Sequence, residues 1–578
     1  MPAGTPPFRV RNALSSRTIS VVWKRYRGVL AIGVALAAIA AYVLTSDPAD
    51  EDDSVTAETV EVADDIASMD LPPEVVPWEV AEAEGRTDEI EWGERCDTTT
   101  GTLRLPYIPE LSCFAPFEGD NGGATAPGVT ATTIRVVAYE VDRSGALVGS
   151  FVDILGSAAS AESTEATQRG FVEMFSHYYE TYGRAVELVR FQATGAPDDA
   201  VAAVADAETI ARDLEPYIVL GGPALTNAFA DTLANRGVIC ISCAPGQPNR
   251  FYEERAPYVW DILKNPEQNG IAANEYIGKR LAGRPAKFAG DPAMREKERV
   301  FGSVHIELGP DTVEIEEILE ADLKEYGVEL AANVGYTDPT QVSATGRDMI
   351  TRLKEAGVTS VIFTGDPLAP GTLTRIATEQ GYFPEWIITG EAFIDTTILS
   401  RTYDQQQWAH AFGPANLFAR STSGSSAAAE LWRWYFGTEI PVPGAASAAL
   451  YGPLLVLFLV LQFMGPDVNA DAFQQTLFTV PTLPGSPTLG QISFGTRLWE
   501  DPDFTALDDQ AEVWWDPTAE GPDELAIVGK GMWRWMDNGA RVLPGDWPET
   551  EPSVFDPAGA VTMYEEPPLV PPDYPPVR

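Results

Sequence analysis

The side chains that could carry out chemistry are few in this chain, and their spacing follows no catalytic pattern. Its 578 residues include three histidines, His177, His305 and His410, and none belongs to an HExxH or similar zinc-binding motif. The Gly-Lys pairs that start at Gly278 and Gly529 lack the spacing of a phosphate-binding loop and its following Ser or Thr. We therefore expect no catalytic residue, no metal and no cofactor, and we predict that the chain is not an enzyme.

The carboxylates between residues 501 and 512 lie at the offsets of a calcium-binding loop. Such a loop needs glycine at its sharp turn, where this chain has Ala506, and an apolar anchor, where it has Asp508. The sequence therefore does not favour calcium binding.

The four cysteines form two local pairs, Cys96 with Cys113 and Cys240 with Cys243. A bond in the first pair would close a loop. Three residues of extended strand place Cα atoms about 10 Å apart, beyond disulfide reach. A bond between Cys240 and Cys243 therefore requires a sharp turn after Ile241. A redox Cys-x-x-Cys motif starts at a helix N-terminus, whereas Cys240 ends a predicted strand. A structural disulfide is favoured over redox chemistry, and whether it forms stays open.

Polar side chains also follow several predicted strands. Asp142 and Ser144 come after the strand at residues 134–140, Glu307 ends the run RVFGSVHIE, and Asp366 follows SVIFTG. Ligands of parallel sheets bind outside the carboxyl ends of the strands. These four residues are therefore candidate ligand-binding residues.

Two stretches of the chain, residues 217–242 and 360–391, have the same pattern. Each is an apolar run, a glycine turn, an amphipathic helix closed by Gly237 or Gly381, and another apolar run, which is typical of a βαβ unit. Strands and helices alternate in two such series between residues 129 and 390. We predict an α/β fold with two Rossmann-like lobes, each a parallel sheet flanked by helices, that grip a ligand between them.

The N-terminus predicts export. Residues 28–45 are uncharged and apolar, no acid appears before Asp47, and six bases precede the run: Arg9, Arg11, Arg17, Lys24, Arg25 and Arg27. This order predicts a cytoplasmic segment at residues 1–27 and a transmembrane helix at 28–45. Since 18 apolar residues are the lower limit for a span, a signal cleaved near Ala38 and Ala40 is the alternative. The remainder would be extracytoplasmic, tethered to the membrane or secreted.

The charge is strongly acidic. A net charge of -46 argues against a nucleic-acid partner, because binding phosphates requires a basic surface. Residues 47–94 hold 18 acids and the single base Arg86, so we expect residues 46–94 to be a disordered spacer. An acidic tail that binds a partner is the alternative.

The remaining boundaries follow from the order of the predicted elements. We expect a disulfide-stapled segment at residues 95–131 and a Pro-rich, loosely held tail at 551–578. Lobe one would comprise 132–262 and about 405–480, and lobe two 263–404 and about 481–550 with C-terminal strands. The apolar run at residues 447–465 is interpreted as a buried helix, because Asp467 and Asp471 follow it and the next base is Arg497. A membrane span is the alternative, because the run is long enough.

Four stretches resemble type I periplasmic binding proteins, the solute receptors of ABC importers for branched-chain and other amino acids: DNGGATAPGVTATTIRVV, RPAKFAGDPAMREKERVFGSVHIE, TGDPLAPGTLTRIATEQGYFPEWIITGE and TYDQQQWAHAFG. The likeness covers about residues 128–546. It implies three crossovers between the lobes, hinge closure on a small polar solute such as an amino acid or amide, a monomer, and delivery to an ABC permease. A sensory ectodomain that signals to a membrane partner is the alternative.

The resemblance also implies ligand-binding residues. In such receptors the loop after the fourth lobe-one strand presents a helix N-terminus to the ligand carboxylate, and here that loop contains Pro223, Ala224, Leu225 and Thr226. The alternative is that Thr226 only caps the helix.

The next lobe-one loop contributes Ala244, Gly246 and Gln247, but Pro245 and Gly246 replace the small residue and Thr of amino-acid receptors. A hydroxyl donor is therefore missing there. In lobe two, Glu391 lies where these receptors place the acid that binds the ligand ammonium. The alternative for Glu391 is an exposed acid after a strand.

Overall fold

The computed structural model describes Ile66, Met69 and residues 71–107, 111–141, 160–223, 225–307, 310–338, 341–421, 427–442, 445–524, 527–565 and 570–578. One compact unit comprises Val60–Arg578. The expected anchor or signal at residues 28–45 lies outside the described residues. In the described part, no helix is long and apolar enough to cross a membrane.

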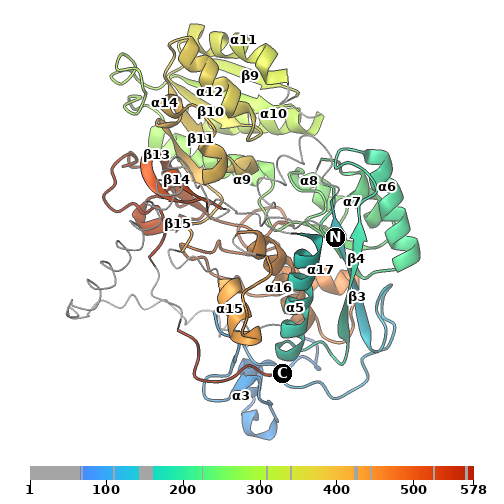
Figure 1. Cartoon of the computed structure of the whole chain (residues 1–578). Helices are drawn as coiled ribbons and strands as arrows, with labels where there is room; N and C mark the ends of the chain where they lie inside the picture. The colour runs from blue at the N-terminus through green and yellow to red at the C-terminus, as the bar shows by residue number, and fades with distance from the viewer. Residues whose placement is uncertain are drawn as a thin grey trace, which may run out of the picture. The chain divides into compact units, whose positions relative to one another are not determined.

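The first sheet has five parallel strands in the order β4-β3-β5-β6-β7; β3 and β4 lie side by side in Figure 1. Its strands are β3 Thr133–Glu140, β4 Ala185–Gln192, β5 Ile218–Leu220, β6 Ile239–Ile241 and β7 Val259–Trp260. The first-lobe helices are α5 Ala161–Tyr178, α6 Ala200–Thr209 with a π-helical extension Ile210–Leu214, α7 Ala228–Asn235, α8 Asn249–Glu253, α15 Ala427–Phe436, α16 Ala445–Met464 and α17 Ala470–Thr479. This lobe matches the predicted parallel sheet with helices.

The second sheet has eight strands in the order β14-β13-β12-β11-β10-β8-β9, with β15 paired to β13. They are β8 Phe301–Ile306, β9 Ala332–Tyr336, β10 Ser360–Thr364, β11 Glu385–Ile388, β12 Ala411–Ala415, β13 Gln510–Pro522, β14 Val528–Trp535 and β15 Arg541–Val542. The pairs from β9 to β12 are parallel, whereas β13 to β15 pair antiparallel. The second sheet is therefore mixed, and not purely parallel as predicted.

Helices cover both faces of this second sheet. On β10, Val361 and Phe363 pack in the core that contains helices α11 and α12, whereas Ile362 packs in the core that contains α9 and α10. The helices are α9 Pro266–Tyr276 with a π-helical extension Ile277–Leu281, α10 Pro310–Glu325, α11 Val342–Glu355, α12 Ala369–Glu379, α13 Thr397–Ser400 and α14 Gln405–Trp408. Burial on both faces explains why these strands are almost continuously apolar in sequence.

Both repeated stretches form the predicted βαβ units. Strands β5 and β6 pair in parallel with Val219 opposite Cys240, and β10 and β11 pair in parallel with Val361 opposite Trp386. The closing glycines adopt the left-handed conformation, with φ of 72° at Gly237 and 61° at Gly381, as expected after a helix C-terminus.

The return to lobe one occurs later than predicted. Strand β12 pairs with β11, so the chain from 405 to 415 belongs to the second lobe and not to the first. The reason is that Ala411 and Phe412 complete the buried sheet beside Trp386 and Ile387. The apolar run at residues 447–465 forms α16, whose side chains lie in the first-lobe core next to α5. The interpretation as a buried helix is confirmed.

The segment before the first sheet is more ordered than predicted. Residues 71–94, part of the expected spacer, contain α3 Trp78–Ala83 and the 3-10 turn Thr87–Glu89, and Val75 and Trp92 are buried. Apolar residues between the acids give this stretch a core to pack against. The short strands β1 Cys96–Asp97 and β2 Thr102–Leu103 follow.

Both cysteine pairs are bonded, Cys96 with Cys113 and Cys240 with Cys243. The second bond has a Cα–Cα distance of 5.9 Å. Ser242, with φ of 56°, makes the sharp turn that the sequence requires.

The C-terminal tail is held against the first lobe. Val577 donates its N–H to the Tyr178 hydroxyl at 2.8 Å, and Arg578 donates to the Tyr435 carbonyl at 2.8 Å. The prediction of a loosely held end is wrong for these residues, because aromatic side chains of α5 and α15 bind it.

Among the described residues, three crossovers connect the two lobes: residues 261–265, the segment that starts at residue 416 after β12, and residues 480–509. The first and third lie against each other, since Asp261 forms a parallel bridge with Thr505 and Lys264 Nζ donates to the Asp509 carbonyl at 2.7 Å. This agrees with the three crossovers that the resemblance implies.

Candidate functional site

Four strands of the second sheet end in polar side chains at the same edge. Glu307 follows β8, Tyr336 ends β9, Asp366 follows β10 and Glu391 follows β11. Strands β8 to β11 are parallel, so their carboxyl ends meet at the edge where ligands of such sheets bind. The sequence pointed to Glu307, Asp366 and Glu391, but it missed Tyr336, which a search for polar strand ends would have found.

Both oxygens of the Asp366 carboxylate accept hydrogen bonds from within the protein. Its Oδ2 accepts the Tyr336 hydroxyl at 2.5 Å, and its Oδ1 accepts the N–H groups of Leu368 and Ala369 at 2.7 and 3.1 Å. Burial raises the pKa of Asp366, and the Tyr336 hydrogen bond opposes that rise. Asp366 therefore stabilises the start of α12 and positions Tyr336.

Two glycines make room for these side chains. A Cβ atom on Gly335 would lie 1.8 Å from Glu307 Oε1, and one on Gly365 would lie 2.4 Å from the Tyr336 hydroxyl. Larger residues at either position would displace the polar groups at the sheet edge.

Glu307 is also paired. His305 Nε2 lies 3.2 Å from Glu307 Oε1, and His305 Nδ1 lies 3.8 Å from Glu316 Oε2. The Thr364 hydroxyl donates to Glu316 Oε1 at 2.9 Å. Burial raises the pKa of Glu316, while the nearby His305 lowers it.

Glu391 differs from these acids. It is half-buried, and its carboxylate makes no hydrogen bond or ion pair with any residue that the structure describes. Burial raises the pKa of Glu391 to about 7, and repulsion from Glu316 adds to the rise. Such a carboxyl group is stabilised by any cation that reaches it.

The backbone around Glu391 is strained. Gly390 has φ of 75°, and two non-glycine residues, Ala392 and Phe393, have φ of 48° and 61°. Non-glycine residues in this region cost about 1–3 kcal/mol each and concentrate at functional sites. The loop that carries Glu391 is therefore held in a costly conformation by its surroundings.

In the first lobe, the Thr226 hydroxyl accepts the Ala228 N–H at 3.3 Å, while the N-cap of α7 is Asn227, whose side chain makes no capping hydrogen bond. Leu225 is 50% exposed and Pro223 is buried. Gly222 lets this loop contact the disulfide loop, because a Cβ there would lie 2.6 Å from the Cys243 carbonyl oxygen. Ala224, Asp142 and Ser144 lie outside the described residues.

The disulfide loop holds the other first-lobe candidates. Ala244 is buried and its carbonyl oxygen accepts the Tyr252 hydroxyl at 3.0 Å. Gly246 is exposed and Gln247 is half-buried. The two first-lobe loops therefore offer uncharged groups, in contrast to the acids of the second lobe.

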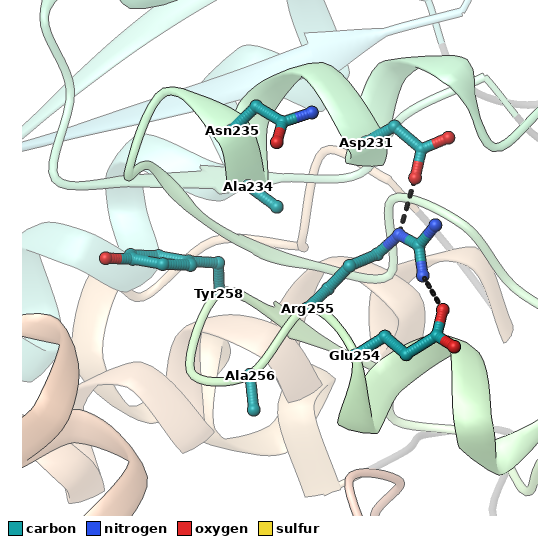
Figure 2. A pocket seen from close by; sticks show the side chains of 7 residues that line it. All are labelled: Asp231, Ala234, Asn235, Glu254, Arg255, Ala256 and Tyr258. Atoms are coloured by element: carbon teal, nitrogen blue, oxygen red, sulfur yellow. Dashed lines mark hydrogen bonds and ion pairs between the residues drawn. The ribbon is translucent and has the colours of Figure 1, made fainter.

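A surface cavity of about 280 Å³ lies elsewhere on the first lobe (Figure 2). Within it, Arg255 pairs with Asp231 at 2.5 Å and with Glu254 at 3.5 Å. Its other lining residues are Ala234, Asn235, Ala256 and Tyr258. Asn235 ends α7 and Tyr258 precedes β7, so the cavity lies at the amino edge of the sheet, opposite the ligand-binding edge.

No protein-family model and no curated protein sequence matches the chain. Among solved structures, the Leucine-, isoleucine-, valine-, threonine-, and alanine-binding protein from Brucella ovis is 13% identical, with a TM-score of 0.50 over 72% of this chain and 98% of that one. An R. palustris ABC-transporter solute-binding protein in complex with 4-hydroxybenzoate is 13% identical, with a TM-score of 0.49 over 72% and 98%.

A fatty acid ABC transporter substrate-binding protein from Thermomonospora curvata is 14% identical, with a TM-score of 0.46 over 70% of this chain and 93% of that one. The names of these three structures describe an amino-acid-binding protein and two solute- or substrate-binding proteins of ABC transporters. At these identities the likeness shows the fold alone, and the assignment rests on the Brucella protein. This chain has the periplasmic-binding-protein fold of type I.

Proposed function

We propose that this chain is an extracytoplasmic receptor that captures a small polar solute with a cationic group between its two lobes and delivers it to an ABC permease. The observation that carries the proposal is the half-buried carboxyl group of Glu391 at the carboxyl edge of the second sheet, which has no partner among the residues that the structure describes. The fold supports it, because lobes of this kind close on a ligand by hinge motion.

The two lobes differ in a way that favours a zwitterion such as an amino acid or a related amide. The second lobe offers the acid Glu391, while the first lobe offers the N-terminus of α7 behind Leu225 and Thr226. A helix N-terminus favours an anionic group, and a buried carboxylate favours an ammonium group. A simple acid without a cation would be repelled by Glu391.

The test is a thermal-shift screen of the extracytoplasmic chain with amino acids, amides, ureas, short peptides and 4-hydroxybenzoate. A ligand with a cationic group should raise the unfolding temperature. Glu391→Gln should weaken its binding roughly 10- to 100-fold, since a hydrogen bond to a charged group contributes about 1.5–3 kcal/mol.

Glu355→Gln is the matched control, because Glu355 is an exposed acid at the end of α11. Silence across the whole panel would contradict a solute receptor. Equal binding by the wild type and Glu391→Gln would contradict the assigned role of Glu391.

We further propose that the mature protein is a monomer tethered to the membrane by residues 28–45. Cell fractionation with and without these residues tests the tether. Co-purification with a permease supports transport, whereas co-purification with a membrane kinase or cyclase instead would support the sensory alternative.

A further inference from the structure

Asn416 is the first residue of the second crossover, directly after β12, and its side chain joins three parts of the chain. Its Nδ2 donates to Asn269 Oδ1 of α9 at 2.7 Å and to the Gly390 carbonyl at 3.1 Å. Gln510 Nε2, at the start of β13, donates to Asn269 Oδ1 at 3.0 Å and to Asn416 Oδ1 at 3.1 Å. We call Asn269, Asn416 and Gln510 the amide triad.

The amide triad lies where the crossovers enter the second lobe. Asn269 follows the first crossover, Asn416 starts the second and Gln510 directly follows the third. Asn269 and Gln510 are 2% and 1% exposed. Because a buried amide that loses a partner is costly, movement of one crossover is resisted by the other two.

A second set of contacts fixes the same crossover. Arg541 donates to the carbonyls of Asn416 and Leu417 at 3.0 and 2.8 Å and to Asp509 Oδ1 at 2.8 Å. The Leu417 N–H donates to Asp395 Oδ2 at 2.9 Å. The second crossover is therefore bound to the third crossover on one side and to the loop after β11 on the other.

Gly390 brings this crossover next to the candidate ligand-binding residue. It has φ of 75°, and a Cβ atom on it would lie 2.6 Å from the Asn416 backbone nitrogen. Gly390 directly precedes Glu391, and Asp395 lies four residues after Glu391. The loop of residues 390–395 is thus held at both ends by Asn416 and Leu417.

We propose that Asn416 is a positioning residue that couples movement of the crossovers to the conformation of the Glu391 loop; the functional meaning of this coupling rests on the proposed function. When the lobes rotate about the crossovers, the amide triad carries the change to Gly390 and hence to Glu391. In reverse, a ligand held by Glu391 biases the crossovers toward one lobe arrangement.

The experiment is amide hydrogen exchange of the ligand-free full chain. The reporters are the N–H groups of Ile394 and Thr396, which donate to the carbonyls of Glu391 and Phe393. Asn416→Ala should speed exchange in residues 390–396 roughly tenfold, as expected for loss of the one side-chain hydrogen bond that reaches this loop, at Gly390, while exchange in β5 and β6 stays unchanged.

A second variant, Asn416→Asp, keeps the side-chain volume but cannot donate to Gly390, so it should give the same local effect. Asn235→Ala, at an exposed asparagine on α7, is the control. Unchanged exchange in residues 390–396 for both Asn416 variants, or an equal rise across both sheets, would overturn the proposal.

A double-mutant cycle separates coupling from simple loss of structure. If the triad acts as a unit, Asn416→Ala combined with Gln510→Ala should change loop exchange by less than the sum of the two single effects; additive effects count against the triad. Loss of binding in Glu391→Gln with unchanged loop exchange in Asn416→Ala rejects the coupling alone. Rapid loop exchange in Asn416→Ala with full binding by Glu391→Gln rejects the proposed function alone.

Discussion

At the scale of single residues, the acids at the edge of the second sheet are distinguished by their partners. Asp366 is held by Tyr336 and two backbone N–H groups, and Glu307 is paired with His305. Glu391 has no such partner among the described residues. Burial of such an unpaired carboxylate lowers the stability of the ligand-free protein and leaves the group available to a ligand.

The raised pKa of Glu391 predicts that the stability of the protein and its affinity for a cationic ligand change in opposite directions as the pH rises. Because its pKa is raised from 4.5 to about 7, the stability that comes from its protonation is full below pH 4.5 and is lost as the pH rises through 7. Affinity for a cationic ligand should instead rise over this pH range, because only the carboxylate attracts it.

Unfolding temperatures and dissociation constants measured between pH 4.5 and 8 check both trends. Glu391→Gln should flatten the affinity profile and remove only the part of the stability change that Glu391 contributes, because other buried acids such as Asp395 also have a raised pKa. Glu355→Gln should leave both profiles as in the wild type. A wild-type affinity that falls with rising pH would contradict the assigned role.

At the scale of elements, the two disulfides close loops of different length, with sequence separations of 17 and 3. Loop-closure entropy grows with loop length. Cys96→Ala with Cys113→Ala should lower the free energy of unfolding by about 3 kcal/mol, and Cys240→Ala with Cys243→Ala by about 2 kcal/mol. Denaturant unfolding of the two double variants measures the difference.

The same comparison tests what the second disulfide does for the ligand loops. Since Gly222 packs against the Cys243 carbonyl, loss of the Cys240–Cys243 bond should loosen the loop of Leu225 and Thr226. Hydrogen exchange there should increase in this variant and not in the Cys96 and Cys113 variant. The reverse order of exchange would show that the bond does not support the ligand loops.

At the scale of the whole molecule, the C-terminal tail links the two lobes. Tyr564 donates its N–H to the Arg420 carbonyl at 2.8 Å and packs on the second-lobe core, whereas Val577 and Arg578 bind α5 and α15 of the first. Deletion of residues 570–578 should therefore lower the free energy of unfolding by about 1–2 kcal/mol, the value of two or so hydrogen bonds.

Denaturant unfolding of the truncated chain checks this expectation. Tyr178→Phe, which removes only the hydroxyl that accepts the Val577 N–H, should reproduce part of the loss. Val570→Ala is a control within the tail, because Val570 is 79% exposed. A truncated chain as stable as the full chain would show that the tail contacts contribute nothing.

The sequence by itself determined the features that depend on neighbouring residues. The two βαβ units, the glycines that end their helices, the turn needed between Cys240 and Cys243 and the buried helix at residues 447–465 all follow from local patterns of polarity and turn residues. These local patterns also predicted which strand ends carry polar groups, and therefore the edge of the sheet where a ligand would bind.

Only the tertiary structure decided which of these polar groups are available. Glu307, Asp366 and Glu391 look equivalent in sequence, because each follows a buried strand; the partner that occupies Asp366 lies 30 residues away in β9. In the same way, β12 joined the second sheet and Asn416 reached Gly390, Asn269 and Gln510. Hydrogen bonds and sheet pairing between distant segments leave no local pattern, so the availability of Glu391 and the coupling through Asn416 emerge only when the chain is folded.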